Sequence, residues 1–198
     1  MTNTMSTATR LLIYTDGSCV GNPGPGGWGA VVQWIKGDRI VNERELCGGD
    51  PGRTTNNRME MQAAISTLRA MKIEYLMDGP LPPITLRSDS NLLIKGMTEW
   101  LPGWKRRGWR KADGKPVENA ELWQQLAQEC CGLEVTWEWV RGHAKDPINN
   151  RADALARQAA ERPSARFDLP TGENYGGDEP AAYWPSLGGT HSSSLANS

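Results

Sequence analysis

Hydrophobic and polar positions in the first quarter of the chain predict three strands. Residues 10–15, 29–35 and 40–47 are short runs rich in aliphatic, β-branched and aromatic residues, which suit the pleated surface of a sheet. The segments between them contain many residues that favour turns. Turn-rich connections between consecutive strands are typical of antiparallel neighbours, so the pattern predicts an antiparallel meander.

The spacing of apolar residues then changes to that of a helix. After "TTNN", whose Thr and Asn are helix-start signals, apolar residues recur at helical intervals through residue 71. Further along, the pattern predicts a strand at residues 84–88, helices at 90–99 and 119–131, a strand at 133–140 and a helix at 149–161. This order predicts one α/β domain over residues 10–161, in which helices pack on a mixed sheet.

The two ends of the chain lack such patterns. Residues 1–9 are mostly small and polar, and residues 162–198 are dominated by Pro, Gly and Ser. Segments of this composition cannot bury enough apolar surface to fold. We therefore expect a flexible leader and a largely disordered tail.

Composition and charge narrow the class of protein. The net charge of the 198-residue chain is −1, so any nucleic-acid site needs a local concentration of positive charge. There is no apolar run long enough to span a membrane, and the N-terminus lacks the apolar centre of a secretory signal. The four cysteines form no C-x-x-C pair, and only two histidines accompany them. This argues against a zinc site and favours reduced thiols in a cytoplasmic protein.

Positive charge gathers in residues 100–116, "WLPGWKRRGWRKADGKP". The segment holds six Lys or Arg, one acid and three interleaved Trp. A solvated loop would explain the charge alone, but cations that meet phosphate and Trp that packs on sugars favour nucleic-acid binding.

The glycine-rich stretch "GPGGWG" raises a different possibility. Gly24, Gly26 and Gly29 match the G-x-G-x-x-G pattern of dinucleotide-binding loops. A β-type run follows, however, where that motif requires a helix, and no G-K-[ST] is present for a P-loop. The stretch is better interpreted as a connection between antiparallel strands that lets other groups approach the backbone.

Four acids are candidates for chemistry, although each also has a local explanation. Asp16 suits a turn, Glu60 and Asp89 suit helix starts, and Asp153 can pair with Arg157 at i+4. Their positions together suggest more. Asp16 and Asp89 each end a predicted strand, and if those two strands are neighbours in the sheet, both side chains project from the same side of it. Glu60 and Asp153 each lie in the first turn of a helix that must pack on the same sheet. Carboxylates that converge without a basic partner repel, and Mg²⁺ is the natural remedy for an all-carboxylate site.

Further polar residues accompany these acids. Asn56 precedes Glu60 by four residues and Asn149 precedes Asp153 by four, so each shares a helix face with an acid and can orient substrate or a water. His143 lies in a loop before the last helix. It is either simply exposed or, near a metal site, suited to moving protons.

Taken together, the chain resembles a type 1 ribonuclease H of the bacterial form. The segments "TDGSCVGNPGPGGWGA", "GRTTNNRMEMQAA", "SDSNLLIKG", "WKRRGWRKADGKPVEN", "WEWVRGHA" and "NNRADALAR" occur in the family's order over about residues 11–160. The resemblance implies an RNase H-like fold with a mixed five-stranded sheet, three antiparallel strands followed by two parallel ones, and helices on both faces. It also implies an endonuclease that hydrolyses the RNA strand of RNA–DNA hybrids and leaves 5′-phosphate and 3′-hydroxyl ends.

The resemblance also assigns roles to residues. It implies that Asp16, Glu60, Asp89 and Asp153 are the catalytic, metal-binding carboxylates, with His143 assisting proton transfer or product release. Two Mg²⁺ ions, for which Mn²⁺ can substitute, would act with substrate bound, Asp16 bridging both. For the substrate it implies contacts to the RNA strand from Asn22, Asn56 and Gln62, and a contact to a DNA-strand phosphate from Thr55. It implies that the basic segment grips the DNA strand, through Trp100, Trp104, Lys105, Arg106 and Arg107. Asn149 is a further candidate for substrate binding, because it shares a helix face with Asp153. Leu92 and Leu93 stand where the bacterial form often has an aromatic residue.

The expected partner is an RNA–DNA hybrid, bound by a monomer with no membrane association. Two alternatives remain open on the residues alone. A non-catalytic hybrid-binding protein would use the same basic segment but would not need all four acids. A nuclease of the transposase or integrase type shares the arrangement of acids, but it would need additional DNA-binding domains, for which this length leaves little room.

Overall fold

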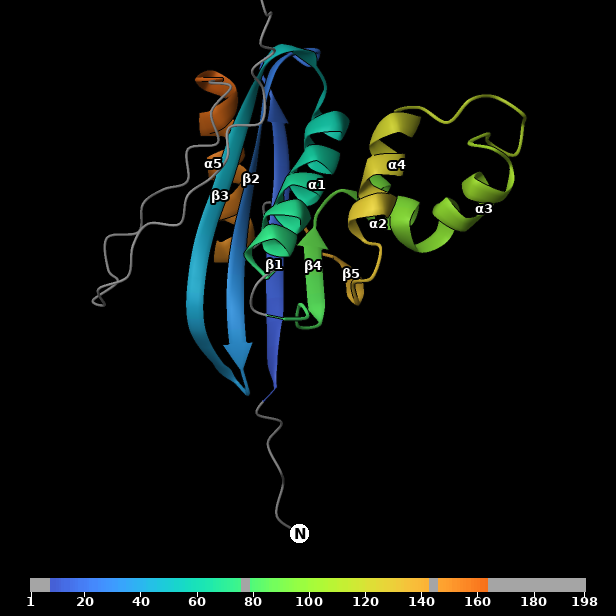
Figure 1. Cartoon of the computed structure of the whole chain (residues 1–198). Coiled ribbons are helices and arrows are strands. Elements are labelled where there is room, and N and C mark those ends of the chain that lie inside the picture. The colour runs from blue at the N-terminus through green and yellow to red at the C-terminus, as the bar shows by residue number, and fades with distance from the viewer. Residues whose placement is uncertain (1–7, 76–78, 143–145, 164–198) are drawn as a thin grey trace, which may run out of the picture.

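The computed structural model describes residues 8–75, 79–142 and 146–163. Its sheet is formed by β1 (Thr9–Cys19), β2 (Gly24–Lys36), β3 (Arg39–Thr54), β4 (Ile84–Ser88) and β5 (Val135–Trp139). The spatial order is β3-β2-β1-β4-β5 (Figure 1). The β1–β2 and β2–β3 pairs are antiparallel, whereas β4 pairs in parallel with β1 and with β5. The predicted mixed five-stranded sheet is confirmed.

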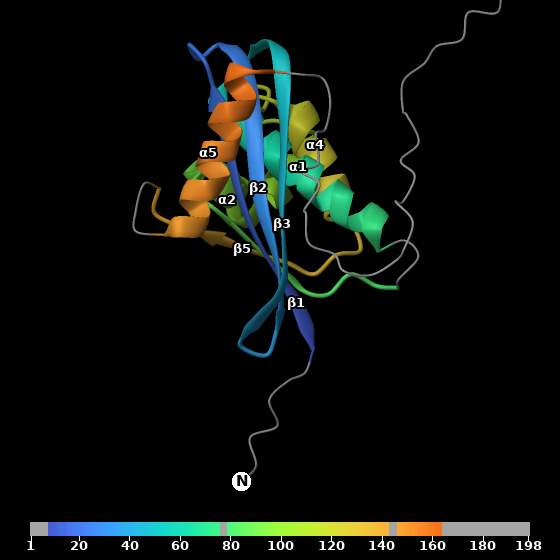
Figure 2. The same cartoon turned by 90° about the vertical axis from the view of Figure 1, so that its left-hand side faces the viewer.

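Helices cover both faces of this sheet, as expected. The helix α1 (Asn56–Glu74) packs against β1 and β2 on one face, and α5 (Pro147–Glu161) packs against the same strands on the other (Figure 2). The helices α2 (Asn91–Lys95), η1 (Gly96–Trp100), α3 (Leu101–Arg106) and α4 (Ala120–Glu129) follow in chain order. Of these, α4 lies beside α1, and α3 stands farthest from the sheet (Figure 1).

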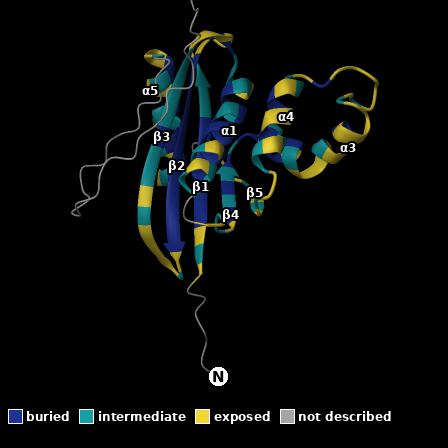
Figure 3. Cartoon of the chain, in the orientation of Figure 1, coloured by how far each residue is buried: buried dark blue, intermediate teal, exposed yellow. Residues whose placement is uncertain are grey.

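Two apolar layers hold the helices in place. The larger layer lies between the sheet and α1 and includes Leu11, Ile13, Ile65 and Leu68, all fully buried. The smaller layer lies under α5 and includes Leu12, Tyr14 and Ala152. Alternate residues of β1 therefore enter different layers, which follows from the two-residue period of a strand. Most of β1 is accordingly buried (Figure 3).

The glycine-rich stretch differs from its prediction. The pattern predicts a connection before residue 29, but β1 continues to Cys19 and β2 already begins at Gly24, so Gly26 and Gly27 lie inside a strand. The physical reason is packing by α5. A Cβ added at Gly27 would lie 2.2 Å from the backbone N of Ala160, and one at Gly29 would lie 2.4 Å from the backbone O of Ala152. Glycine lets α5 approach the sheet closely.

Some predicted helix boundaries are also wrong. The last helix begins at Pro147 rather than at residue 149, because Asp146 caps it and Pro147 occupies its first turn. This start places Asp153 in the second turn of α5, not in the first. Glu60 likewise lies in the second turn of α1, because that helix begins at Asn56. The segment expected to form one helix at 90–99 runs on through a π-helical turn to Arg106, so the basic segment begins as a helix. No helix in the described ranges is long and apolar enough to cross a bilayer.

Candidate active site

The register of the sheet brings Asp16 and Asp89 to one edge. The strands β1 and β4 run in parallel, with Tyr14 opposite Arg87, and Asp16 and Asp89 each lie two residues beyond that pair. Asp16 is still within β1, opposite Gly29 of β2, and not at the strand end as predicted. Asp89 directly follows the last residue of β4, as predicted. Parallel strands thus deliver the two carboxylates side by side.

Glu60 joins them because α1 approaches β1 very closely at Gly17. A Cβ on Gly17 would lie 2.2 Å from the backbone N of Glu60 and 2.3 Å from the backbone C of Met59. Only glycine permits this contact. The residue after Asp16 therefore sets the distance between the carboxyl-bearing strand and the carboxyl-bearing helix.

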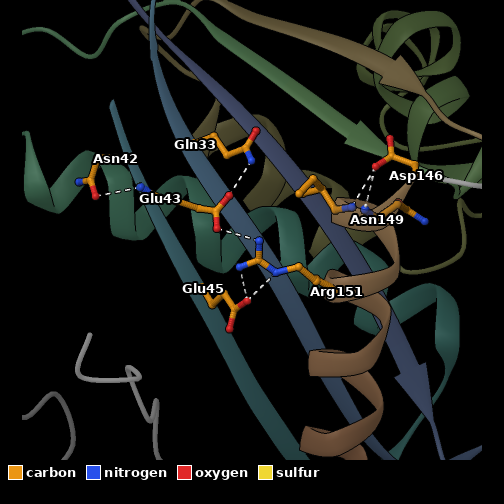
Figure 4. Close-up of polar contacts among 8 residues, drawn as sticks. Gln33, Asn42, Glu43, Glu45, Asp146, Asn149 and Arg151 are labelled. Atoms are coloured by element: carbon orange, nitrogen blue, oxygen red, sulfur yellow. Dashed lines mark hydrogen bonds and ion pairs between the residues drawn. The ribbon is translucent and has the colours of Figure 1, made fainter. Parts of the chain in front are cut away.

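Asp153 comes from α5 on the other face of the sheet, and several contacts fix that helix. The Asp146 carboxylate accepts hydrogen bonds from the backbone N–H groups of Ile148 (3.0 Å) and Asn149 (3.3 Å). Arg151 then ties α5 to β3 (Figure 4). Its guanidinium donates to Glu43 Oε1 at 2.7 Å and to Glu45 Oε1 at 2.8 Å.

Glu43 extends this network into the next strand. Its Oε2 accepts a hydrogen bond from Gln33 Nε2 of β2 at 2.6 Å (Figure 4). Burial acts to raise the pKa of Glu43, but the hydrogen bonds from Gln33 and Arg151 outweigh it and hold the pKa below its usual value. Two strands thus anchor the part of α5 that carries Asp153.

Electrostatic coupling links Asp16 to the other three acids. Burial and, next in size, the charge of Asp89 raise the pKa of Asp16 to about 7, against the lowering effect of the Gly17 N–H. The carboxylates of Asp153 and Glu60 also act on it in the raising direction. Burial likewise raises the pKa of Glu60, which a hydrogen bond from Ser90 opposes and the charge of Asp89 reinforces.

This arrangement fits a divalent cation. In the described residues, no basic side chain forms an ion pair with Asp16, Glu60 or Asp89, so their mutual repulsion is uncompensated by protein. The donor set is all carboxylate oxygen, which suits hard cations such as Mg²⁺. Among the described residues, no three Asp, Glu, Cys or His side chains lie close enough together to hold a metal ion as they stand.

Sequence reasoning missed three residues that support these acids. Ser90 caps α2, where its hydroxyl accepts from Leu93 N–H, and it also donates to Glu60 Oε2. Gly142 lies against Asp89, since a Cβ there would lie 2.2 Å from Asp89 Oδ2. The half-exposed Trp139 donates from Nε1 to the backbone O of Asp89 at 3.0 Å. The "DS" after the β4 run was a signal for Ser90, as Asp–Ser pairs favour helix starts.

The residues expected to contact the hybrid outside the basic segment, with Thr55 on the DNA strand and the others on the RNA strand, lie near the start of α1. The Asn22 side-chain oxygen accepts from the backbone N–H of Asn56 at 3.2 Å, which brings these two predicted residues together. Thr55 is the N-cap of α1 and accepts from Arg58 N–H. The Gln62 amide donates to Ser66 Oγ at 2.8 Å.

Asn149 differs from this group in its burial. It is 1% exposed, and neither polar atom of its amide has a hydrogen-bond partner among the residues that the structure describes (Figure 4). Its position one turn before Asp153 on α5 agrees with the expected shared face. Such a buried, unsatisfied amide is suited to holding a water.

The basic segment carries a groove. Trp100, Trp104, Arg106, Arg107 and Lys111 line it together with Glu99, Pro102, Gly103 and Ala112, and its volume is about 590 Å³. Trp104 is 8% exposed and packs between Trp100, at 5.6 Å between ring centroids, and Trp123 of α4, at 5.2 Å, with the ring planes tilted by 52° and 55°. Trp100 is more exposed, and Lys105, Arg106 and Arg107 are exposed.

Two predictions find no further support in the structure. His143 lies outside the described residues, so its predicted proton-transfer role stays a prediction. Leu92 packs partly buried against the main apolar layer and Leu93 is fully buried in it, so both serve packing where the bacterial form often has an aromatic residue.

Comparison with known proteins gives concordant matches. The family model "RNase H" matches residues 8–161. A protein of Pseudomonas aeruginosa named Ribonuclease HI is 51% identical over 160 residues, covering 80% of this chain and 99% of the relative. A protein of Paracoccus denitrificans named Ribonuclease H is 51% identical over 147 residues, covering 74% and 90% respectively.

Solved structures agree with the sequence matches. The crystal structure of LC9-RNase H1, described as a type 1 RNase H with the type 2 active-site motif, is 34% identical with a TM-score of 0.69, covering 79% of this chain and 74% of that one. LC11-RNase H1, solved in complex with an RNA/DNA hybrid, is 26% identical with a TM-score of 0.56, covering 77% and 97%. With its sheet order and these matches, the chain belongs to the RNase H family of ribonucleases, in the bacterial type 1 form.

Proposed function

We propose that this protein is an endonuclease that hydrolyses the RNA strand of RNA–DNA hybrids and leaves 5′-phosphate and 3′-hydroxyl ends. The observation that carries the proposal is the cluster of Asp16, Glu60, Asp89 and Asp153, in which burial and like charges raise the pKa of Asp16 to about 7. Repulsion between buried carboxylates is unfavourable, so such a cluster is expected where the active protein binds a cation between them.

In this proposal the four carboxylates hold two divalent cations when substrate is bound. Asp16 would contribute to holding both ions, Glu60 and Asp89 would hold one of them, and Asp153 would hold the other. Mg²⁺ is the expected ion, with Mn²⁺ as a substitute. When bound, such cations supply activation of the attacking water and stabilisation of the leaving 3′ oxygen.

The protein's own residues bind and orient the hybrid. Asn22 is exposed and its side-chain oxygen accepts from the Asn56 N–H, so its N–H₂ group is the part of the amide assigned to donate to a 2′-hydroxyl in the minor groove. Asn56 and Gln62 are assigned to the same RNA strand, and Thr55 to a phosphate of the DNA strand. Hydrogen bonds to 2′-hydroxyls are what distinguish RNA from DNA.

Outside the acidic cluster, the groove of the basic segment is assigned to the DNA strand. Lys105, Arg106 and Arg107 supply charge that meets phosphates, while Trp100 packs on a sugar and Trp104 braces it from beneath. His143 is assigned to proton transfer or product release. Asn149, buried beside the site, orients a water rather than touching substrate directly.

We further infer a monomer in the cytoplasm. Each of the four cysteines is described by the structure, and none forms a disulfide, which suits a reducing compartment.

The test is a cleavage assay on three labelled duplexes: RNA–DNA hybrid, duplex DNA and duplex RNA. We expect cutting of the hybrid's RNA strand only, in Mg²⁺ and not in EDTA, with product ends that a ligase and a polymerase accept as 5′-phosphate and 3′-hydroxyl. Binding without cutting would instead identify a hybrid-binding protein. Cutting of duplex DNA would indicate a nuclease of the transposase or integrase type.

A further inference from the structure

Asp153 differs from the other three acids of the cluster because a basic side chain of the protein forms an ion pair with it. Arg157, one turn further along α5, donates from Nη2 to Asp153 Oδ2 at 2.5 Å. In the part of the chain that the structure describes, no basic side chain pairs with Asp16, Glu60 or Asp89. One half of the cluster is therefore neutralised by protein, and the other half is not.

The contact occupies an oxygen that a metal ion would also use. A carboxylate binds a metal ion through its oxygen lone pairs and its negative charge. A guanidinium that donates a hydrogen bond to the same oxygen occupies a lone pair and also offsets the negative charge. For Asp153 to become a full ligand, Oδ2 must be released from Arg157, or the cation must bind beside a positive charge. Either route makes cation binding at Asp153 less favourable than it would be without Arg157.

Exposure indicates how strong this competition is. The Asp153 side chain is 17% exposed, but the Arg157 side chain is 60% exposed, so water screens the pair. Pairs of this kind at i and i+4 on a helix are weak. Arg157 therefore adjusts the affinity for a cation and does not block the site.

We propose that Arg157 is an internal counter-cation of the metal site: it holds Asp153 in the metal-free protein and sets the Mg²⁺ concentration at which the Asp153 half of the cluster fills. The proposal rests on the assignment of Asp153 as a metal ligand. Arg157 is a positioning residue in this account, since it acts through Asp153 and is not assigned to the substrate.

The test is a Mg²⁺ titration of the full-length protein, first alone and then with a cleavage-resistant RNA–DNA hybrid bound, followed by the ¹³C signals of the aspartate and glutamate carboxyl carbons. Arg157→Gln is expected to lower the Mg²⁺ concentration at the midpoint of the Asp153 signal by about two- to fivefold. Arg157→Lys, which keeps the charge, should leave the midpoint near that of the unmodified protein. An unchanged or higher midpoint in Arg157→Gln would overturn the proposal.

Arg69→Gln is the matched control. Arg69 pairs with Glu129 across α1 and α4 at 2.8 Å, with exposed fractions of 52% and 13%, close to those of the Arg157 pair. Its loss should leave the Asp153 midpoint unchanged. An equal shift in both variants would mean that general charge, and not the Asp153 contact, is responsible.

The same titration separates this proposal from the proposed function. If Mg²⁺ shifts none of the four carboxyl signals of the unmodified protein, with or without the bound hybrid, the assignment of the metal site is wrong and so is the role of Arg157. If those signals respond but Arg157→Gln changes nothing, only the role of Arg157 is wrong.

Discussion

At the scale of single residues, Asp16 is the most strongly perturbed group of the site. Burial and three neighbouring carboxylates raise its pKa to about 7, against an ordinary value of 3.8. Between about pH 4 and pH 7, the folded protein therefore keeps a proton on Asp16 that the unfolded chain has already released. Stability is fully present below the unfolded pKa and is lost as the pH rises through the folded pKa.

Asp16→Asn should therefore stabilise the protein in EDTA. We expect its advantage in free energy of unfolding to grow from about pH 4 to about pH 7, to level off above that at on the order of 3 kcal/mol, and to shrink when Mg²⁺ is added to the unmodified protein. Urea unfolding at pH 5 and pH 8 measures this. An advantage that does not change with pH would show that Asp16 titrates normally.

Two glycines offer a second residue-scale prediction, because a Cβ would meet different neighbours. At Gly17 the neighbour is the backbone of Glu60, which cannot yield, whereas at Gly142 it is the end of the Asp89 side chain, which can rotate. Gly17→Ala should lose about 1–3 kcal/mol of stability. Gly142→Ala should keep its stability but lose on the order of 10- to 100-fold in kcat, because Asp89 is displaced. Thermal melts and hybrid cleavage separate the two; full activity in Gly142→Ala would contradict the packing at Asp89.

At the scale of elements, α5 needs its anchors to place Asp153. Arg151 joins it to Glu43 and Glu45 of β3 (Figure 4). Arg151→Met should cost about 0.5–1 kcal/mol of stability and also lower kcat severalfold, since the helix that carries Asp153 is loosened. Steady-state kinetics and urea unfolding provide both values.

Arg44→Met is the control for this variant. Arg44 joins the same strand to Glu74 at the far end of α1, with exposed fractions of 36% and 29%, against 39% and 30% for the Arg151–Glu43 pair. It should lose similar stability while kcat stays unchanged. Equal kcat values in the two variants would show that Arg151 does not position Asp153.

The basic segment is an element with a separable role. Replacing Lys105, Arg106 and Arg107 by Gln should weaken hybrid binding and reduce the slope of log K against log salt by up to about 2–3. The same change at Arg10, Lys36 and Arg39, which are exposed at the other end of the sheet, should leave the slope unaltered. Binding titrations between 50 and 200 mM salt, on the order used for such slopes, test this; an unchanged slope in the first variant would reject the assignment.

The elements also show how far sequence reasoning reaches. Strand and helix periods predicted the order of the elements. Of the four acids, Asp89 follows its strand as predicted, whereas Asp16 lies inside β1 and Glu60 and Asp153 lie one turn further into their helices than expected. Local sequence patterns did not predict the structure where it depends on packing between residues far apart in the chain. The glycines of β2 resemble a loop because their partner, α5, lies more than a hundred residues away, and Gly142 has no local signal at all.

For the whole molecule, the central claim is that two faces of one sheet supply a single carboxylate site: α1 brings Glu60, α5 brings Asp153, and the parallel strands β1 and β4 bring Asp16 and Asp89 (Figures 1 and 2). The basic segment, beyond α4, is a separate surface. Substrate binding and chemistry should therefore be separable by mutation.

One measurement tests this claim most directly: the dissociation constant for an RNA–DNA hybrid and the turnover number, determined side by side for the unmodified protein and Asp16→Asn. We predict that Asp16→Asn binds the hybrid within a few fold of the unmodified protein and has no detectable Mg²⁺-dependent turnover. Cleavage by Asp16→Asn at the normal rate would contradict the account.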